Sequence, residues 1–482
     1  MSISVEILSR DQLAEVHERS LKLLAGTGVR IESEAARELL KKKGAVIDAV
    51  SAVVKFPREL VEESLALAGR NFSLGGRRPD WSFSPGRGDS ILCMSGEAVF
   101  FGEVPGEKPR DGLSRDWLNV TRLGDALDEV GLYWRSITPG DRGDRMTDYI
   151  DYLTLVISNF SKHIQDPFQH REQAPWLLEI LSAVYGGREA VIKNKPFSTL
   201  FCPQSPLVLK GHEIEATLAL SGWGIPIAIM PMALMGATAP ASLLGTLLLT
   251  NAEVLASICL FQAAEPGAPI IYAPVLTMME PRTGGYFAGG VEQSLMNGAA
   301  AQMGKHYGLT TMITGLETDA QEPGCQAAED KALTSSLSFF SGADIFIGPG
   351  ILGSDMTLNL AQFMMDVEVF RKLKVLKKGL SLNEADWLDQ VVGEVGPGGN
   401  FLAHISTAKN IRKQWHRPAF GRHDSLEAWF APEAPDCPAQ AAQMADKIIA
   451  GHTPLPLGDE LAGELANIRK KAEAVPGSYP FV

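Results

Sequence analysis

Residues 309–350 read LTTMITGLETDAQEPGCQAAEDKALTSSLSFFSGADIFIGPG, and this stretch decides the fold. Two short apolar runs, LTTMITG (309–315) and ADIFIGP (343–349), lie on either side of a helix-like segment, AEDKALTSSLSFFSG. Parallel strands need a crossover connection of this kind, because the C-terminal end of one strand and the N-terminal end of the next lie at opposite ends of the strands. The stretch therefore predicts one strand–helix–strand unit of a parallel sheet.

The same alternation extends toward the N-terminus. Five further apolar runs begin at intervals of about 30 to 40 residues: GLYWRSIT (131–138), SKHIQDP (161–167), FSTLFCP (197–203), IPIAIMP (225–231) and APIIYAP (268–274). Helical patterns such as ASLLGTLLLTNAEVLASICLFQ lie between them. Seven such units predict an α/β fold, a (β/α)8 TIM barrel with one strand that the pattern does not reveal. A doubly wound open sheet is the alternative, although no GxGxxG follows the first run.

Segments outside the repeat predict a lobe and an extension. Residues 1–110 combine amphipathic patterns that stop at glycines with a stretch of β-formers and turn residues, so we expect a helical and small β lobe. Residues 111–380 are expected to form the barrel. Residues 381–482 are punctuated by Pro and Gly and partly helical, and we expect a C-terminal helical extension that packs on the barrel.

The composition excludes several classes of function. The net charge is −13 and no block of Lys and Arg offsets it, so nucleic-acid binding is not expected, and a cationic small substrate fits better. The five cysteines lie far apart, without CxxC or HExxH, so neither a metal site nor a disulfide framework is predicted. The N-terminal sequence lacks the apolar core of a signal peptide. We therefore predict a cytoplasmic protein with free thiols.

One long uncharged segment, residues 216–252, raises the question of a membrane span. Pro226, Pro231 and Pro240 interrupt it, and no basic residues flank it. Each piece between the prolines has the length of a strand or a helix. We therefore expect the buried core of a barrel and no membrane association.

The loop after LTTMITG is the first candidate for the active site, because barrel enzymes place their sites at the C-terminal ends of the strands. It contains Glu317, Asp319 and Gln321 and has no basic residue before Lys331. Acids and amides without cations suit a pocket for a positive charge. Asp319 has an alternative role as the cap of the following helix, and Lys331 is expected on the solvated face of that helix.

Residues at the ends of the other runs complete the expected rim. They are Gln165, Asp166, Gln204, Met232, Tyr272 and the glycine turn GPGILG with Gly348 and Gly350. The alternative role of barrel core applies to His163, Tyr272, Trp134 and Phe346, but aromatic side chains near a rim also form boxes for cations. The glycine turn has the composition of an anion-binding turn, although such turns are common.

Six stretches together resemble the trimethylamine methyltransferase family, barrel enzymes that pass a methyl group to a cobalt corrinoid protein. They are GTGVRIESEAARELL, FPRELVEESLALAGRNFSLGGR, MPMALMGATAPASLLGTLLLTNAEVLASICLFQAAEPGAPIIYAP, PRTGGYFAGGVEQSLMNGAAAQMGKHYGL, TDAQEPGCQAAEDK and FLAHISTAKNIRKQWHRPAFGRHDSLEAW. The resemblance implies transfer of a methyl group to a Co(I) corrinoid, cob(I)alamin or a relative of it. No DxHxxG stretch is present, so the corrinoid is expected on a separate partner protein and not bound tightly by this chain.

The resemblance also implies a substrate class. Trimethylamine-specific members carry pyrrolysine, an electrophilic imine residue, in a loop that matches the one around Gln321. Glutamine cannot form an adduct with an amine, so the chain resembles the non-pyrrolysine branch, whose known relatives act on glycine betaine and similar quaternary amines. The expected catalytic residues are Glu317, Asp319 and Gln321. The expected substrate-binding residues are His163, Gln204, Tyr272, Phe346, Gly348 and Gly350, and Arg282 is a further candidate for the substrate carboxylate.

Three alternatives remain open at this point. The first is the same chemistry on another betaine, such as proline betaine or carnitine. The second is a non-catalytic barrel that binds a quaternary amine. The third is a barrel lyase or hydrolase, which would need a metal or cofactor for which no residue cluster stands out. The expected partners are the cognate corrinoid protein, a small quaternary amine and further copies of the chain in a homo-oligomer, without nucleic acid or membrane.

Overall fold

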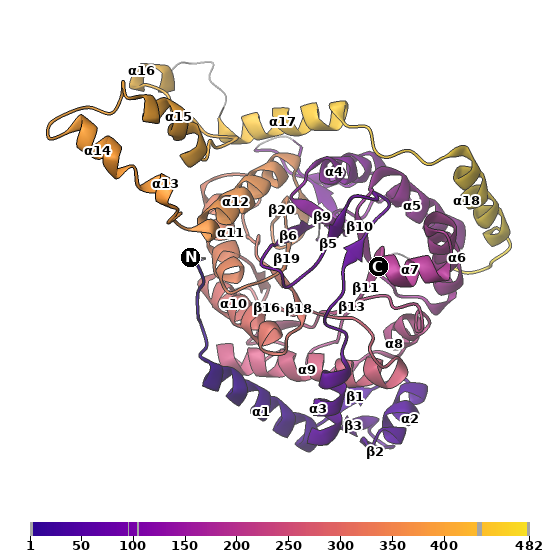
Figure 1. Cartoon of the computed structure of the whole chain (residues 1–482). Helices are drawn as coiled ribbons and strands as arrows, with labels where there is room; N and C mark the ends of the chain where they lie inside the picture. The colour runs from indigo at the N-terminus through magenta and orange to yellow at the C-terminus, as the bar shows by residue number, and fades with distance from the viewer. Residues whose placement is uncertain (1–2, 95, 104–105, 431–435, 480–482) are drawn as a thin grey trace.

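The computed structural model describes residues 3–94, 96–103, 106–430 and 436–479. Among these residues, eight parallel strands close into a barrel (Figure 1). Around the barrel, in order of pairing, they are β10 (His163–Pro167), β11 (Phe197–Phe201), β13 (Ile227–Ile229), β15 (Ile270–Tyr272), β18 (Thr310–Thr314), β19 (Ile345–Ile347), β6 (Ile91–Cys93) and β9 (Val130–Tyr133). The predicted (β/α)8 barrel is confirmed, and each of the seven apolar runs supplies one strand.

The strand that the sequence pattern does not reveal is β6. It pairs in parallel with β19 on one side and with β9 on the other, so it closes the barrel. It is only three residues long and follows a turn-rich stretch, which hides it among the β-formers of residues 71–103. The division of the chain at residues 110 and 380 stays a prediction, and it assigns this barrel strand to the lobe.

The barrel strands are buried on both faces, so apolar residues dominate them. In β19, Ile345 and Ile347 belong to the cluster inside the barrel, whereas Phe346 packs outward against the helices. In β18, Met312 points inward and Ile313 outward in the same way. This alternation decides which strand residues can face a ligand inside the barrel and which cannot.

Helices surround the barrel strands on the outside (Figure 1). Those of the described barrel region are α4 (Ser114–Ala126), α5 (Met146–Asn159), α6 (Ala174–Tyr185), α7 (Arg188–Asn194), α8 (Gly211–Leu218), α9 (Leu243–Ala264), α10 (Val291–His306), α11 (Cys325–Phe340) and α12 (Leu360–Lys378). By length and composition alone, α9 is the one described helix that could cross a membrane. It packs against the N-terminal helices, and 78% of its most apolar window is buried inside the fold, as expected for core.

The N-terminal residues form a lobe that is joined to the barrel through a shared sheet. The lobe contains α1 (Arg10–Gly26), β1 (Val29–Ile31), α2 (Glu34–Lys42), β2 (Val46–Asp48), β3 (Val53–Lys55) and α3 (Arg58–Leu67). A short strand from the barrel region, β12 (Val208–Leu209), adds to the edge of this sheet beside β1. The hairpin of β4 (Leu74–Gly75) and β5 (Ser82–Phe83) packs into the cluster inside the barrel.

Two small sheets are built from the segments that follow the barrel strands at their C-terminal ends. One contains β14 (Met232–Met235), β16 (Val275–Met279) and β17 (Tyr286–Phe287). The other contains β20 (Ile351–Leu352), β21 (Thr357–Leu358), β7 (Phe100–Phe101) and β8 (Arg110–Asp111). We use the word mouth for this end of the barrel, because these segments form its rim.

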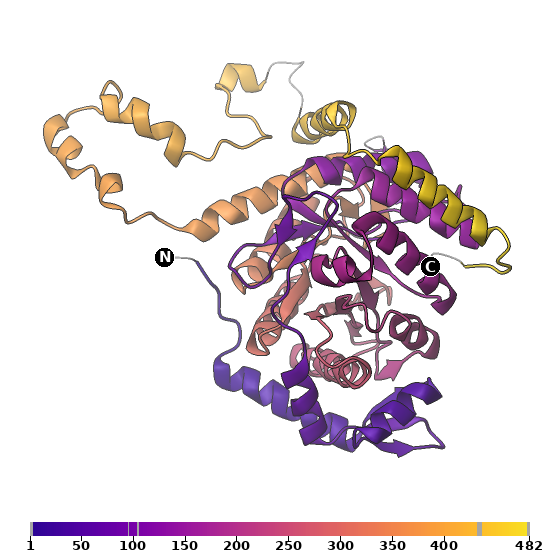
Figure 2. The ribbon, with the colours of Figure 1, turned by 45° about the vertical axis from the view of Figure 1, so that its right-hand side comes forward.

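The C-terminal residues return to the outside of the barrel. Helix α17 (Cys437–Gly451) packs on α12 and α4, and α18 (Asp459–Ala472) packs on α5 and α6. Between α12 and α17 the chain leaves the body and forms α13 (Glu384–Trp387), α14 (Asp389–Val395), α15 (Ile405–Gln414) and α16 (Leu426–Trp429). Figure 2 shows these four short helices standing away from the barrel.

A buried ion pair joins the last two barrel helices to the mouth. Lys331 of α11 is fully buried, and its Nζ lies 2.8 Å from Oδ2 of Asp366 on α12. The same Asp366 oxygen accepts the backbone N–H of Gly350 at 2.8 Å, and Lys331 donates to the Gly348 carbonyl at 3.3 Å. The expectation of a solvated Lys331 was wrong, because α11 turns this position inward toward α12.

Lys331→Met tests the ion pair, because it keeps the length of the side chain but leaves the Asp366 carboxylate buried without its cation. Loss of one partner of a buried pair costs about 3–5 kcal/mol. We expect a decrease of that size in the free energy of unfolding, measured by urea denaturation. The double variant Lys331→Met/Asp366→Asn should recover part of it. A single variant as stable as the wild-type chain would contradict this account of the mouth.

Candidate active site

Glu317 lies directly after β18, at the mouth, and is buried. The Tyr286 hydroxyl donates to its Oε2 atom at 3.1 Å, and the Gln293 amide lies 3.5 Å from the same oxygen. Burial raises the pKa of Glu317 above its usual value, although the hydrogen bond from Tyr286 and the charge of Lys331 oppose the shift. This carboxylate is therefore enclosed, and a cation beside it would stabilise its charged form.

A second carboxylate, Asp355, faces the same region. Its loop is held against the Glu317 loop by two backbone hydrogen bonds, from Gly353 N–H to the Ala320 carbonyl and from Ser354 N–H to the Thr318 carbonyl. Enclosure, together with the negative charge of Glu317, raises the pKa of Asp355 well above its usual value. Two acids whose charges disfavour each other in one enclosed region form a place that favours a cationic ligand.

Asp355 lies outside the positions that the strand ends predict. It follows the glycine turn at a distance of five residues from Gly350, inside a short hairpin and not at a strand end. Ser354 and Asp355 both have positive φ, 54° and 67°. Aspartate adopts this left-handed conformation more readily than most residues, so the one available signal was an acid in a tight turn beside the rim.

Asp319 and Gln321, which were predicted to be catalytic together with Glu317, occupy different positions. The Asp319 carboxylate accepts the Ala288 N–H at 3.0 Å and also the Ser354 hydroxyl, so it ties three loops of the mouth together. Gln321 is exposed, and its amide donates to the Asp319 carbonyl at 3.2 Å. Of these three residues, Glu317 is the buried carboxylate, and its hydrogen bonds come from side chains and not from a backbone N–H.

The glycine turn after β19 is already occupied by a group of the protein itself. Gly350 donates its N–H to Asp366, and the Gly348 carbonyl accepts from Lys331. Both glycines have positive φ, 113° at Gly348 and 84° at Gly350. The turn does bind an anion, as its composition suggested, but that anion is the Asp366 carboxylate and not a substrate.

His163 and Gln204 lie away from the enclosed acids. His163 is the first residue of β10, at the opposite end of the strand from the mouth, and it contacts the Gly75 carbonyl and the Ser198 hydroxyl at 3.3 and 2.8 Å. Burial lowers the pKa of His163 to about 3, so it is neutral at pH 7. Gln204 is exposed in the turn before β12. Arg282, the further candidate, is exposed beside Glu280.

Tyr272 and Phe346 do not face the barrel interior, which corrects their expected role as walls of a cation pocket. The Tyr272 hydroxyl donates to Asn251 of α9 at 3.0 Å, and Phe346 packs on Phe339 and Phe370 of the outer helices. Strand alternation turns both side chains outward. Both residues are therefore part of the layer between the strands and the helices.

One aromatic side chain that packs against the inner cluster near the mouth is Trp134, which follows β9. Its indole N–H donates to Glu97 Oε1 at 2.9 Å, and Arg135 lies 3.2 Å from Glu97 Oε2. Gly96, with a φ of 117°, lets this loop approach the body, since a Cβ there would lie 2.5 Å from Ile351. Trp134 and Glu97 thus form a pair of an aromatic and an acidic side chain at the rim, as Tyr286 and Glu317 do.

Asp166 is buried close enough to Arg135 and Glu97 to interact with their charges. It lies on the outer side of β10, where the Tyr152 hydroxyl donates to its Oδ1 atom at 3.0 Å. Burial raises the pKa of Asp166 to about 7, against the lowering effect of Arg135 and with a further increase from Glu97. Gln165, the other residue expected here, points inward and accepts the Ser198 hydroxyl at 3.1 Å.

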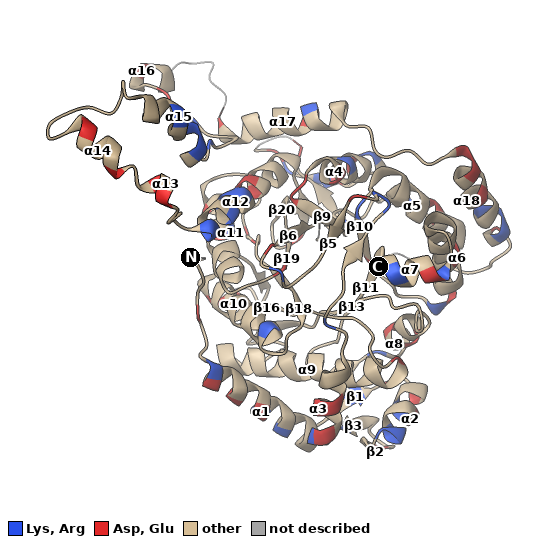
Figure 3. Ribbon diagram, in the orientation of Figure 1, with Lys and Arg blue, Asp and Glu red and all other residues tan. Residues whose placement is uncertain are grey.

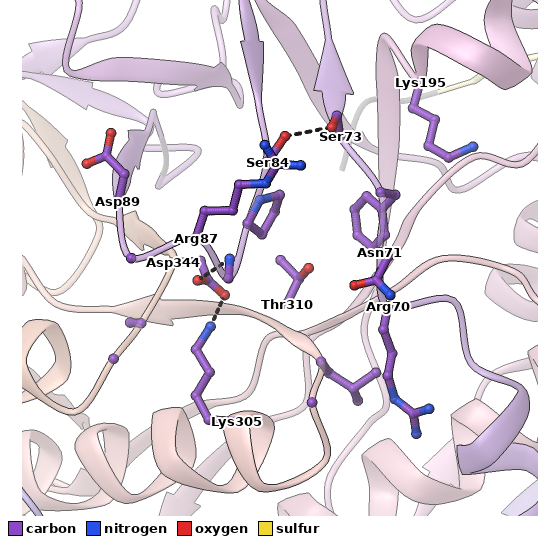
Figure 4. A pocket seen from close by; sticks show the side chains of 18 of the residues that line it. Arg70, Asn71, Ser73, Ser84, Arg87, Asp89, Lys195, Lys305, Thr310 and Asp344 are labelled. Carbon is purple, nitrogen blue, oxygen red and sulfur yellow. Dashed lines mark hydrogen bonds and ion pairs between the residues drawn. The ribbon is translucent and has the colours of Figure 1, made fainter.

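A cavity of about 740 Å³ opens at the other end of the barrel, where the strands begin (Figure 4). Its charged lining residues are Arg70, Arg87, Lys193, Lys195, Lys305, Lys377, Asp89 and Asp344. Lysines compensate both acids, since Lys305 pairs with Asp344 and Lys374 lies 2.9 Å from Asp89. A cavity with an excess of positive charge repels a cation, so a cationic ligand is expected at the mouth.

Within the described part of the chain, no group of three or more His, Cys, Asp or Glu side chains is arranged to hold a metal ion. All five cysteines are free thiols.

Comparison with known proteins gives a consistent family. The model of the trimethylamine methyltransferase (MTTB) family matches residues 2–476. Trimethylamine methyltransferase MttB of Desulfitobacterium hafniense (strain DSM 10664 / DCB-2) is 30% identical over 465 residues, which cover 96% of this chain and 93% of the relative. Glycine betaine methyltransferase of Desulfitobacterium hafniense (strain Y51) is 30% identical over 463 residues, with 95% of each chain covered.

A solved structure, the Methanosarcina barkeri monomethylamine methyltransferase (MtmB), superposes with a TM-score of 0.48 at 14% identity. The superposition covers 96% of this chain and 91% of that one. A likeness at this level supports no conclusion about the site.

Asp166→Asn tests the electrostatics of the mouth. The pKa of Asp166 is about 7 in the folded chain against an ordinary value of 3.8, so between these values the folded state holds a proton that the unfolded chain has released. The stability that Asp166 contributes therefore falls as the pH rises through this window. In urea unfolding at a series of pH values, the variant should lose less stability than the wild-type chain from about pH 4 to about pH 7. Parallel curves would contradict the raised pKa.

Proposed function

We propose that this chain, which belongs to the trimethylamine methyltransferase family, transfers a methyl group from a quaternary amine to the Co(I) corrinoid of a separate corrinoid protein. The first candidate for the substrate is glycine betaine. One relative at 30% identity is named as a glycine betaine methyltransferase. The observation that carries the proposal is the buried carboxylate of Glu317 with the partly buried Asp355 on a loop bonded to its own. Burial and mutual repulsion raise the pKa of both acids, although the charge of Lys331 opposes the shift.

A quaternary ammonium fits this region for a chemical reason. Its charge is permanent, so it offsets the repulsion between the two acids at any pH at which they are ionised. It has no N–H to donate, so aromatic faces and carboxylates are its natural contacts, and a desolvated cation–π contact contributes about 2 kcal/mol. Two aromatic side chains of the described mouth are Tyr286, whose hydroxyl donates to Glu317, and Trp134, beside Glu97.

The reaction needs no proton from the protein. Co(I), supplied by the partner, attacks a methyl carbon with its electron pair, and the C–N bond breaks with its pair left on nitrogen. The leaving group is a neutral tertiary amine, so no general acid is required. This chain's residues hold the cation, exclude water and aim one methyl group outward toward the partner.

Gln321 supports a quaternary substrate over trimethylamine. It stands where the resemblance places the electrophilic residue of trimethylamine-specific enzymes, and an amide cannot trap an amine lone pair. Gln321 is also exposed and bonded to its own loop, so it is outside the enclosed acids. Other betaines such as proline betaine or carnitine remain candidates of the same class. We further propose a cytoplasmic enzyme that acts as a homo-oligomer.

The direct test is a spectroscopic assay with chemically reduced cobalamin. The purified chain should convert cob(I)alamin to methylcobalamin with glycine betaine, or with one of proline betaine and carnitine, and show little conversion with trimethylamine. Comparable rates with trimethylamine would show that the missing electrophile does not decide the substrate. No conversion with any methylated amine, by a folded chain, would favour a binding protein without catalysis.

Glu317→Gln and Asp355→Asn keep the shape of the side chains and remove the charge. We expect each to raise the KM for the quaternary amine roughly tenfold or more, a loss of about 1.5–3 kcal/mol. Glu329→Gln is the matched control, because Glu329 is an exposed acid on α11 and should leave KM unchanged. If Glu317→Gln lowers the melting temperature while KM stays within about twofold of the wild-type value, Glu317 has only a structural role.

A further inference from the structure

Residues 379–430 form an arm that leaves the barrel after α12 and carries α13, α14, α15 and α16. Figures 1 and 2 show it standing away from the body in both views. Within these residues Phe420 alone is buried, and none of the four helices buries a residue. The arm is attached near its end, where Phe420 joins the core and His416 lies 3.2 Å from Glu368 of α12.

The arm concentrates the large apolar side chains that the described structure leaves exposed. They are Leu380, Leu382, Trp387, Val392, Phe401, Leu402, Ile405, Ile411, Trp415, Leu426, Trp429 and Phe430. The exposed fraction reaches 85% for Leu380 and 84% for Leu402. Three of the eight tryptophans of the chain are in this set. An exposed apolar surface of this extent marks a contact with another molecule.

Short helices cannot hold such a surface in water by themselves. Isolated helices shorter than about 12–15 residues are marginal even in favourable sequences, and most helix stability comes from packing of an apolar face. The longest helix of the arm, α15, has 10 residues. The arm therefore depends on a second surface for its stability.

The charges of the arm indicate what that surface is. The outgoing limb, residues 379–395, carries four acids and no Lys or Arg. The returning limb, residues 405–430, carries five Lys or Arg side chains against two acids, Asp424 and Glu427. The acids of the outgoing limb are Glu384, Asp386, Asp389 and Glu394, and the cations of the returning limb are Lys409, Arg412, Lys413, Arg417 and Arg422. Figure 3 shows red on α13 and α14 and blue on α15. A surface with one acidic and one basic limb is complementary to a copy of itself turned by half a revolution, which is the condition for an isologous dimer.

We propose that the arm pairs with the arm of a second copy of this chain across a twofold axis. The acidic limb of each protomer lies against the basic limb of the other, and the exposed Trp, Phe and Leu side chains form the apolar centre of the interface. Aromatic residues at the centre and charges at the rim are the usual composition of such contacts.

The position of the arm separates this contact from the active site. The arm starts at the C-terminal end of α12, and Lys377 of that end lines the cavity where the barrel strands begin. A protein that delivers a corrinoid must instead reach the mouth, at the opposite end of the strands. The pairing is therefore independent of the proposed methyl transfer, and each can fail without the other.

Charge reversal tests the pairing with its own rescue. One variant carries Lys409→Glu, Arg412→Glu and Lys413→Glu, which leaves both limbs with a net negative charge. The other carries Glu384→Lys, Asp386→Lys and Asp389→Lys, which leaves both limbs with a net positive charge. All six side chains are exposed. By light scattering, the wild-type chain should have twice the chain mass of 52.0 kDa or an even multiple of it. Each variant alone should shift toward a single chain, and an equimolar mixture should return to the wild-type mass.

The mixture also guards against a variant that fails to fold, because only folded complementary arms can pair. Leu402→Glu/Leu426→Glu should likewise dissociate the assembly, whereas Val50→Glu, at a 98% exposed position of the lobe, should not. If the purified wild-type chain is a monomer, the arm binds a different protein and the proposal is overturned. Variants that keep the wild-type mass, or a mixture that does not restore it, would overturn it as well.

Discussion

The buried ion pair between Lys331 and Asp366 is the contact on which the mouth of the barrel depends. It joins α11 to α12, and through the Gly350 N–H it fixes the turn that follows β19. That turn leads into the hairpin that carries Asp355, whose loop is bonded to the Glu317 loop. One internal charge pair thus sets the position of both enclosed acids. Because Lys331 is neutralised by Asp366, its charge does not fully compensate Glu317 and Asp355, and the region keeps a deficit of positive charge.

This deficit distinguishes the two ends of the barrel. The end where the strands begin has a cavity whose charged side chains are mostly Lys and Arg, and the mouth has acids with few cations. A ligand with a permanent positive charge is drawn to one end and excluded from the other. Methyl transfer from a quaternary amine needs this property above all, since the protein has to hold a cation and has no proton to deliver. The family to which the chain belongs supplies the chemistry, and the electrostatics of the mouth favour a quaternary member of its substrates.

The regular parts of the fold were predictable because strands buried on both faces give short, largely apolar runs between helical patterns, and seven of the eight barrel strands lie in such runs. β6 was not recognised because Ile91–Cys93 lies among the β-formers and turn residues of the stretch 71–103, outside the strand–helix repeat. The position of Glu317 after a strand was sufficient to predict that it lies at the mouth. Tyr272 and Phe346 were misplaced because the sequence gives their distance from the strand end but not the side to which the alternation turns them. Asp355 was missed because it lies in a tight turn and not at a strand end. The glycine turn was assigned to the substrate because the residue that its N–H binds, Asp366, is distant in sequence.

The most direct test of the central claim compares two ligands that differ only in charge. Glycine betaine and 3,3-dimethylbutyrate have the same shape and the same carboxylate, but the second has a neutral carbon in place of the quaternary nitrogen. Calorimetric titration of the chain with each ligand measures what the positive charge contributes to binding. The account predicts that glycine betaine binds roughly tenfold or more tightly, the effect of about 1.4 kcal/mol or more from contacts with a charged group. Equal affinity for the two ligands would contradict the claim that the enclosed carboxylates hold a cation.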